Sequence, residues 1–308
     1  MRDLAALGLL SFAILAACAT APRGVHLTRH ADVVDVTLDG QPFAIVHCAA
    51  EPRPFVFPLL GPGGTPMTRS WPMAEADGEE HDHPHHQSLW FAHGDVDGFD
   101  FWAGKARGER IALDGEPQLD GGKVRCRYRW IAEGIVLATE DRVLAFGGSD
   151  TARTVDIDVT LQPAARPLVL GDTKEGTFAL RVHPALRVDG KIATGTLRDS
   201  EGRSGKEVWG QLARWIDDVG TVAGRAVGVA MFDHPDNPSH PVWWHARTYG
   251  LLAANPFGVH DFAKQPAGTG TVTVPLGGAL RCRYRVLLHD GDHDAARIDA
   301  AYRAWAGR

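Results

Sequence analysis

Short segments of alternating apolar and polar residues, separated by glycine, aspartate and proline, run along almost the whole chain and limit what it can fold into. In one example, segment 33–38 is joined by Asp39-Gly40 to a second such segment at 42–47. An Asp-Gly turn in this setting predicts a β-hairpin, because both turn residues adopt positive φ angles. Further strands are expected at 123–132, 135–145, 152–162, 178–188, 226–233, 242–247, 250–254, 271–275 and 279–289.

The one helix that the pattern predicts is C-terminal. Asp294 can cap it, and Ile298, Ala301, Tyr302 and Trp305 would form a single apolar face. Such a helix would pack on the outside of a sheet.

Many strands without long helices between them favour an antiparallel sandwich or barrel over a βαβ fold. Long loops are expected at 59–84 and 190–225, and no linker divides the mature chain. We therefore expect an all-β fold: one large antiparallel β-sandwich domain over 25–308 with a short C-terminal α-helix.

The first eighteen residues have the pattern of a bacterial lipoprotein signal. An apolar run from Leu4 to Ala17 ends in small residues directly before Cys18. This run of about fourteen residues suits the core of a signal peptide and is shorter than the ~20 residues that a membrane-spanning helix needs. The sequence predicts a signal peptide over 1–17, lipidation of Cys18 and a tether over 18–24. A plain secretory signal with a chance cysteine is the alternative.

The residue after Cys18 and the net charge indicate where the protein resides and which partners it can have. Ala19 follows the cysteine, where an aspartate would indicate the inner membrane, so we expect an outer-membrane lipoprotein that faces the periplasm. The net charge is −6 and no basic run occurs, which argues against a nucleic-acid partner. Membrane contact is expected through the lipid anchor alone.

Three cysteines follow Cys18, so at most one disulfide can form among them. Cys126 and Cys282 stand in matching segments, Arg-Cys-Arg-Tyr-Arg, each preceded by a Gly-Gly pair. Alternation places Cys and Tyr on one strand face and Arg on the other. We expect either a Cys126–Cys282 disulfide or two buried free thiols; Cys48 is the third cysteine.

Histidines gather at 81–86, where His81, His83, His85 and His86 lie within six residues, followed by His93 and Asp95. Imidazoles spaced two apart on an extended chain share a face and can bind a metal. His81, His83 and His85 are therefore candidate metal ligands. Hydrogen bonding or metal-free acid–base chemistry is the favoured alternative, and the cofactor remains unassigned.

Two further segments combine charged and aromatic groups. Gly171 to Gly176 is a glycine-bounded turn that contains Asp172, Lys174 and Glu175, and His183 follows it. Residues 232–258 contain His234, Trp244, His245, Arg247 and Asn255. Aromatic rings beside such polar groups are typical of carbohydrate sites, where rings stack on the sugar and polar groups bind its hydroxyls.

Together these segments resemble a bacterial family of unknown function, common in polysaccharide degraders, that has carried the label "methane oxygenase" (PmoA-like). The matching stretches are 82–86, 91–98, 100–102, 171–176, 209–210, 230–235, 244–247 and 249–258. That label implies an integral membrane subunit, and this chain has no apolar segment long enough, so we set it aside. The resemblance implies instead a galactose-mutarotase-like β-supersandwich. Asp97 departs from the Asn usual in the family, and the C-terminal glutamate base of mutarotases has no clear counterpart.

These observations lead to a hypothesis of a carbohydrate-active enzyme, a glycoside hydrolase, lyase or epimerase that uses proton transfer. The alternatives are a non-catalytic sugar-binding lipoprotein and a metal-dependent oxidase. The expected catalytic residues, gathered on one concave face, are His85, His86, His93, Asp172, Lys174, Glu175, His183, His234 and His245. The expected substrate-binding residues are Asp95, Trp102, Trp244, Arg247 and Asn255.

If Cys18 carries the lipid, the Cys18→Ala variant accumulates as an uncleaved or soluble form, because lipidation requires the thiol. Membrane fractionation followed by immunoblotting checks this. A variant that partitions into membranes as the wild type does would contradict the anchor.

Overall fold

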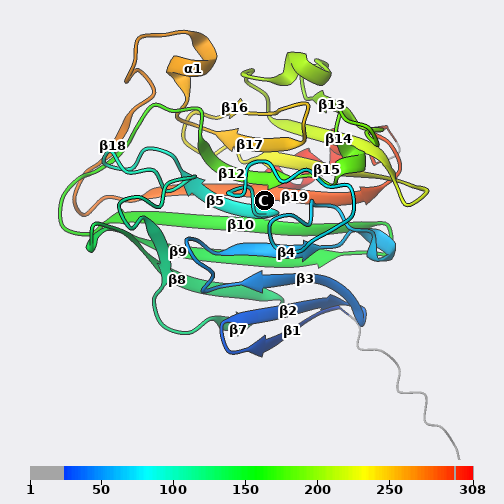
Figure 1. The fold of residues 1–308 in the computed structure, drawn as a ribbon, viewed down its shortest axis with the longest axis horizontal. Coiled ribbons are helices and arrows are strands. Elements are labelled where there is room, and N and C mark those ends of the chain that lie inside the picture. Colours follow the sequence, from blue (N-terminus) through cyan, green and yellow to red (C-terminus); the bar gives the residue numbers. More distant parts are fainter. Residues whose placement is uncertain (1–23, 295, 308) are drawn as a thin grey trace, which may run out of the picture.

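The computed structural model describes residues 24–294 and 296–307 (Figure 1). The expected signal peptide, Cys18 and most of the expected tether lie outside these residues. Within them, no helix is long and apolar enough to cross a membrane.

Two large antiparallel sheets make up most of the described chain. The first sheet has eight strands in the order β1-β2-β3-β4-β5-β12-β17-β16. Their bounds are Val25–His30, Val33–Leu38, Gln41–His47, Phe55–Leu59, Leu89–His93, Gly176–Arg181, Leu251–Asn255 and Trp243–Trp244.

The second sheet has nine strands in the order β13-β14-β15-β19-β10-β9-β8-β6, with β7 also paired to β8. Their bounds, in that order and ending with β7, are Thr196–Asp199, Trp215–Val222, Arg225–Asp233, Leu280–Asp290, Ala152–Pro163, Ile135–Gly148, Lys123–Ala132, Arg110–Leu113 and Gln118–Asp120.

The remaining elements are short. Strands β11 (Leu168–Leu170) and β18 (Val272–Val274) pair as a separate ribbon. Helix α1 spans Val259–Ala263 and helix α2 spans Ile298–Ala306, with 3₁₀ turns at Pro62–Gly64, Pro184–Leu186 and Gly205–Val208.

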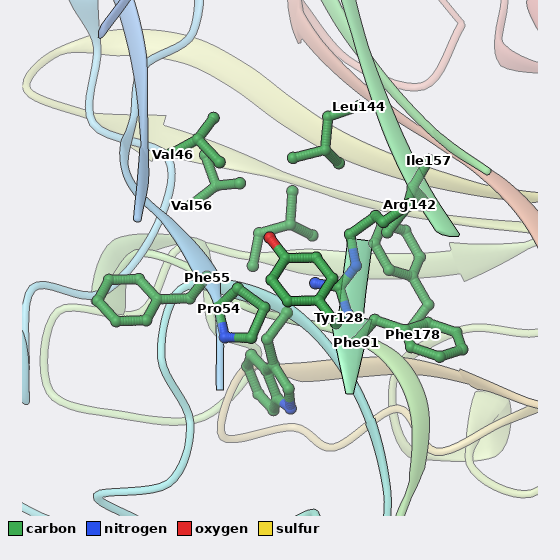
Figure 2. A pocket seen from close by; sticks show the side chains of 12 residues that line it. Val46, Pro54, Phe55, Val56, Phe91, Tyr128, Arg142, Leu144, Ile157 and Phe178 are labelled. Atoms are coloured by element: carbon green, nitrogen blue, oxygen red, sulfur yellow. The ribbon is translucent and has the colours of Figure 1, made fainter. Parts of the chain in front are cut away.

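The core lies between the two large sheets. Phe178 of β12 stacks on Tyr284 of β19 at 5.1 Å between ring centroids. Figure 2 shows this interior around Tyr128 and Arg142, where the remaining cavity measures about 10 Å³. That is at the lower limit of the space that one water needs, so the sheets are closely packed.

Arg142 is a charged group inside this core, and Glu140 neutralises it. The Arg142 Nη2 atom donates to Glu140 Oε2 at 3.1 Å, and the Trp130 indole donates to the same oxygen at 2.7 Å. Buried charges are tolerated when they are paired and hydrogen-bonded in this way.

The structure confirms the all-β antiparallel fold and its short C-terminal helix. The 33–47 hairpin and the strand 123–132 form as expected, and β8 alternates between exposed Lys or Arg and buried residues. Helix α2 packs Ile298, Tyr302 and Trp305 against the outside of the second sheet.

Several expected details were wrong. Asp294 does not cap α2, whose N-cap residue is Arg297. The expected loop 190–225 contains strands β13 and β14. Strand β14 is almost completely buried over its first five residues, so its sequence lacks the alternation that marks a half-exposed strand.

A Cys126–Cys282 disulfide was also a wrong expectation. The three described cysteines are free and buried, as the alternative had it. Cys126 pairs with Arg142, Arg142 with Val159, and Val159 with Cys282. Three strand spacings of ~4.8 Å therefore separate the two cysteines, whereas a disulfide requires Cα atoms within about 7 Å.

Candidate functional site

Two arginines lie on the outer side of the first sheet near the end of β12 and the start of β17. Arg181 of β12 is registered with Leu251 of β17, which bridges in turn to Arg247. Residues aligned in this way point to the same side of a sheet. Phe178, three residues before Arg181 on β12, points into the core. Because side chains alternate along a strand, Arg181 faces outward, away from the second sheet, and so does Arg247.

A loop that we call the histidine loop, residues 81–86, covers this face. Asp82 attaches it, because its carboxylate accepts hydrogen bonds from Arg181 Nη2 at 3.1 and 3.3 Å and pairs with Arg69. The Arg69 and Arg181 side chains are 2% and 0% exposed. Figure 1 shows the segment between β4 and β5, in cyan, crossing this part of the sheet.

The pKa of Asp82 reflects this attachment. Burial alone would raise it, but the charge of Arg181 and the hydrogen bonds from His83 and Arg69 lower it to about 2. Asp82 is therefore ionised at neutral pH, as two buried arginines require.

Two rings of the histidine loop, His83 and His86, stack with the ring of Tyr249. His83 lies parallel to Tyr249, with 5.1 Å between ring centroids, and parallel to His86 at 4.8 Å. His86 is buried, and its Nδ1 atom is 3.2 Å from Arg181 Nη1, from which it accepts a hydrogen bond. Burial and the charges of His85 and Arg181 lower the pKa of His86, so its ring is neutral.

His85 is the least engaged ring of the loop. Its backbone carbonyl accepts from Arg53, while its ring nitrogens make no hydrogen bond to any residue that the structure describes. Burial, and then the charge of Arg53, lower the pKa of His85 to about 4. At neutral pH it presents an uncharged, partly exposed imidazole.

The other half of the site is the turn 172–175 with the residues beside it. Lys174 and Glu175 are partly exposed and paired at 3.1 Å. His245 donates from Nδ1 to the Lys174 carbonyl at 2.9 Å and accepts at Nε2 from Arg247 Nε at 3.0 Å. Burial, and then Arg247, lower the pKa of His245 to about 3, so a neutral ring positions the arginine.

Arg247 is fixed without being neutralised. Its guanidinium carbon lies 5.1 Å from the centroid of the Trp209 ring, and its remaining N–H groups have no acidic partner in the part of the chain that the structure describes. A half-exposed, unpaired guanidinium held against an aromatic ring is suited to bind a carboxylate or a pair of hydroxyls.

Tyr249 connects the two halves. The guanidinium of Arg181 lies 4.5 Å from the centroid of its ring. Burial raises the pKa of Tyr249, while Arg181, Arg247, Glu175 and Asp82 are all close enough to influence it. The histidine loop therefore contacts Tyr249 through His83, and the 172–175 turn is joined through His245 to Arg247, two residues before Tyr249.

Other expected site residues lie beside this face with their polar atoms engaged. Asp172 accepts from the backbone nitrogens of His260 and Gly270. Asn255 donates to Thr173 and accepts from two backbone nitrogens at 2.8 and 3.1 Å. Both hold the turn in place, so the expected direct role of Asn255 in binding substrate does not fit this geometry.

Four more expected residues are either buried or hydrogen-bonded within their own loop. His93 is 1% exposed and donates from Nε2 to the Gly171 carbonyl at 2.8 Å; burial lowers its pKa to about 4. Trp102 and Trp244 are 1% and 0% exposed, so they pack in the interior and do not stack on a ligand. Asp95 accepts from the backbone of Gly98, within its own loop.

His183 and His234 are each held by contacts other than those of the histidine loop and the 172–175 turn. His183 accepts from the Ala185 nitrogen and begins the turn 184–186. His234 follows β15 of the second sheet, where it contacts Arg283 and the Trp305 ring. The expectation that His234 shares the face was wrong, because β15 and β12 belong to different sheets.

The three candidate metal ligands do not gather, because His81 lies apart from His83 and His85, whose ring centroids are 5.7 Å from each other. His81 stacks on Trp71 at 3.9 Å, and His83 binds Asp82 and stacks on Tyr249. Among residues 24–294 and 296–307, no group of three or more His, Cys, Asp or Glu side chains is arranged to hold a metal ion.

Three central residues were absent from the expected site: Tyr249, Arg181 and Asp82. Each lies within two residues of a selected residue in the sequence, but only the pairing of β12 with β17 brings the two sequence regions of Arg181 and Tyr249 together.

The depressed histidine pKa values predict acid sensitivity. His93 and His245 are neutral in the folded protein, whereas unfolded histidine has a pKa near 6.5. Their contribution to stability is complete above about pH 6.5 and decreases as the pH falls toward 4, because the unfolded chain binds the protons.

Urea unfolding at pH 7, 5.5 and 4.5 measures this effect. The unfolding free energy of the wild type should fall with pH, and His245→Gln, which does not titrate, should show a shallower fall. Identical pH slopes for the two proteins would contradict the assignment.

Comparison with solved structures finds distant similarities. A galactose mutarotase-like protein from Lactobacillus casei is 10% identical, with a TM-score of 0.37, covering 86% of this chain and 100% of that one. A second, from Clostridium acetobutylicum, is 9% identical, with a TM-score of 0.35, and coverage is 85% and 99%. A putative aldose 1-epimerase from Escherichia coli is 10% identical, with a TM-score of 0.29, and coverage is 87% and 99%.

No curated protein matches the chain. A family model does match, and it covers residues 33–303, which include every strand from β2 to β19 as well as the histidine loop and Tyr249. The chain belongs to the family of unknown function DUF6807.

Proposed function

We propose that this protein is a carbohydrate-active enzyme, anchored by lipid on the periplasmic side of the outer membrane, whose site is the outer face around Tyr249. The observation that supports this most directly is that His83 and Arg181 pack on the partly exposed ring of Tyr249, two residues after the unpaired guanidinium of Arg247. Sugars are bound by such combinations, because rings pack against their C–H faces and charged groups take their hydroxyls.

The available groups suit proton transfer at a sugar carbon or a glycosidic oxygen, the step that hydrolases, lyases and epimerases share. In this proposal the partly exposed carboxylate of Glu175 accepts the proton. Tyr249, whose raised pKa keeps it protonated, donates a hydrogen bond to the oxygen that gains charge. Arg247 binds a hydroxyl or carboxylate of the substrate.

A non-catalytic sugar-binding protein is the second candidate. It is favoured by the burial of His86, His93 and His245, whose ring nitrogens face protein groups or the interior. Those histidines would then shape the face without exchanging protons with a ligand.

A screen of the purified protein against plant and algal oligosaccharides, including oxidised (3-keto) glycosides, tests both candidates when products are followed by mass spectrometry. Turnover of at least one substrate supports an enzyme. Binding by calorimetry without turnover supports the second candidate. The absence of both turnover and binding for every oligosaccharide tested would contradict a carbohydrate site.

Against an active substrate, Glu175→Gln should lower kcat/KM by roughly 10²–10⁴-fold, because general-base catalysis contributes about that much. The matched control is Glu116→Gln, which removes a carboxylate between β6 and β7 that is paired with Arg29 of β1. Equal losses in both variants, or no loss in Glu175→Gln, would place the chemistry elsewhere.

A further inference from the structure

Arg247 and Tyr249 lie on one tight turn of the candidate site, and both are partly exposed. The turn 247–250 is closed by the Gly250 nitrogen, which donates to the Arg247 carbonyl at 2.8 Å. The backbone nitrogens of residues 188 and 189 both donate to another carbonyl of this turn at 3.0 Å, which fixes its position. Because two residues span at most about 7 Å, one sugar unit can contact both side chains.

The guanidinium of Arg247 is held in a way that leaves its two terminal nitrogens open. Its Nε atom donates to the neutral ring of His245 at 3.0 Å, and its carbon lies 5.1 Å from the centroid of the Trp209 ring. The Nη atoms make no hydrogen bond to any residue that the structure describes. A carboxylate fits this opening, because each of its two oxygens can accept from one terminal nitrogen.

Three acidic side chains near this turn are already paired with other cations. The pairs are Asp82 with Arg69 and Arg181, Glu175 with Lys174, and Glu80 with Arg187. Asp82 therefore serves two buried arginines, while Arg247 forms no ion pair with a described residue. The hydroxyls of a neutral sugar would leave this positive charge uncompensated, whereas a carboxylate would neutralise it. The whole chain carries a net charge of −6, so a local excess of cations is particular to this face.

We propose that the ligand of this face is an acidic carbohydrate, an oligosaccharide containing a uronic acid, whose carboxylate binds the terminal nitrogens of Arg247 while its ring packs against Tyr249. This inference rests on the carbohydrate site proposed above and names the substrate class of that site. Arg247 sets the specificity, because its charge distinguishes a carboxylate at carbon 6 from the hydroxymethyl group of a neutral hexose. His245 is a positioning residue, since it fixes the guanidinium without cancelling its charge.

Calorimetry with the full chain tests the proposal on matched ligands. Oligomers of galacturonate, glucuronate, mannuronate and guluronate are each compared with the same oligomer after methyl esterification, which removes the charge and keeps the sugar ring. We expect at least one acidic oligomer to bind about tenfold more tightly than its ester, because hydrogen bonds between charged partners are the stronger ones. Added salt should weaken the binding of the acid much more than that of the ester.

Substitutions at Arg247 assign the preference to this residue. Arg247→Gln should lower the affinity for the acidic oligomer by about tenfold, to that of the ester, and leave the affinity for the ester nearly unchanged. Arg247→Lys, which keeps the charge and loses the planar fork, should fall between the two. The matched control is Arg281→Gln, which removes an exposed arginine paired with Asp158 on the second sheet and should bind both oligomers as the wild type does.

The outcomes separate this proposal from the carbohydrate site on which it rests. Esters that bind as tightly as their acids would overturn the acidic substrate and leave a carbohydrate site in place. An acidic preference that persists in Arg247→Gln, or displacement of the bound oligomer by an equal concentration of inorganic phosphate, would also overturn the proposal. No binding of any acidic, esterified or neutral oligosaccharide would contradict the carbohydrate site itself. The comparison of acid with ester uses the wild type, so it remains decisive if a variant fails to fold.

Discussion

The candidate site depends on the attachment of Asp82 to two buried arginines. Arg181 has no contact with solvent, and its charge, like that of Arg69, requires an anionic partner in place of water. Asp82 supplies that charge, and because it belongs to the histidine loop, the loop must stay on the sheet. The stacking of His83 and His86, and their approach to Tyr249, follow from this attachment.

Around Arg247 the face is held by hydrogen bonds to neutral groups and not by ion pairs. In our account this leaves the charge of Arg247 free for a ligand. His245 accepts from Arg247 without cancelling its charge, and Trp209 supports the guanidinium from one side. Asp82 is already committed to Arg69 and Arg181, whereas Arg247 has charge available for a ligand. The histidine loop therefore gives the face its shape, and the region around Arg247 gives it an available positive charge.

The fold could be predicted from the sequence where strands are buried on one side only. Strand β8 alternates from Lys123 to Trp130 and was predicted at its observed bounds, whereas β5 is buried along its whole length and was missed. The site was predicted in part. His85, Lys174, Glu175 and Arg247 were found from local clustering, but Trp244 and Asn255 clustered equally well and are interior. Whether a polar or aromatic residue faces a ligand or the core depends on strand register, and His83 meets Tyr249 only through the pairing of distant strands.

A crystal structure of the protein with a bound oligosaccharide tests the central claim most directly. Our account predicts a sugar ring packed against Tyr249, with one of its polar groups within hydrogen-bonding distance of the Arg247 guanidinium and of the Glu175 carboxylate. A sugar bound elsewhere with Tyr249 uncovered would contradict it. One such place is the pocket of about 250 Å³ beside His234 and Trp305 on the second sheet.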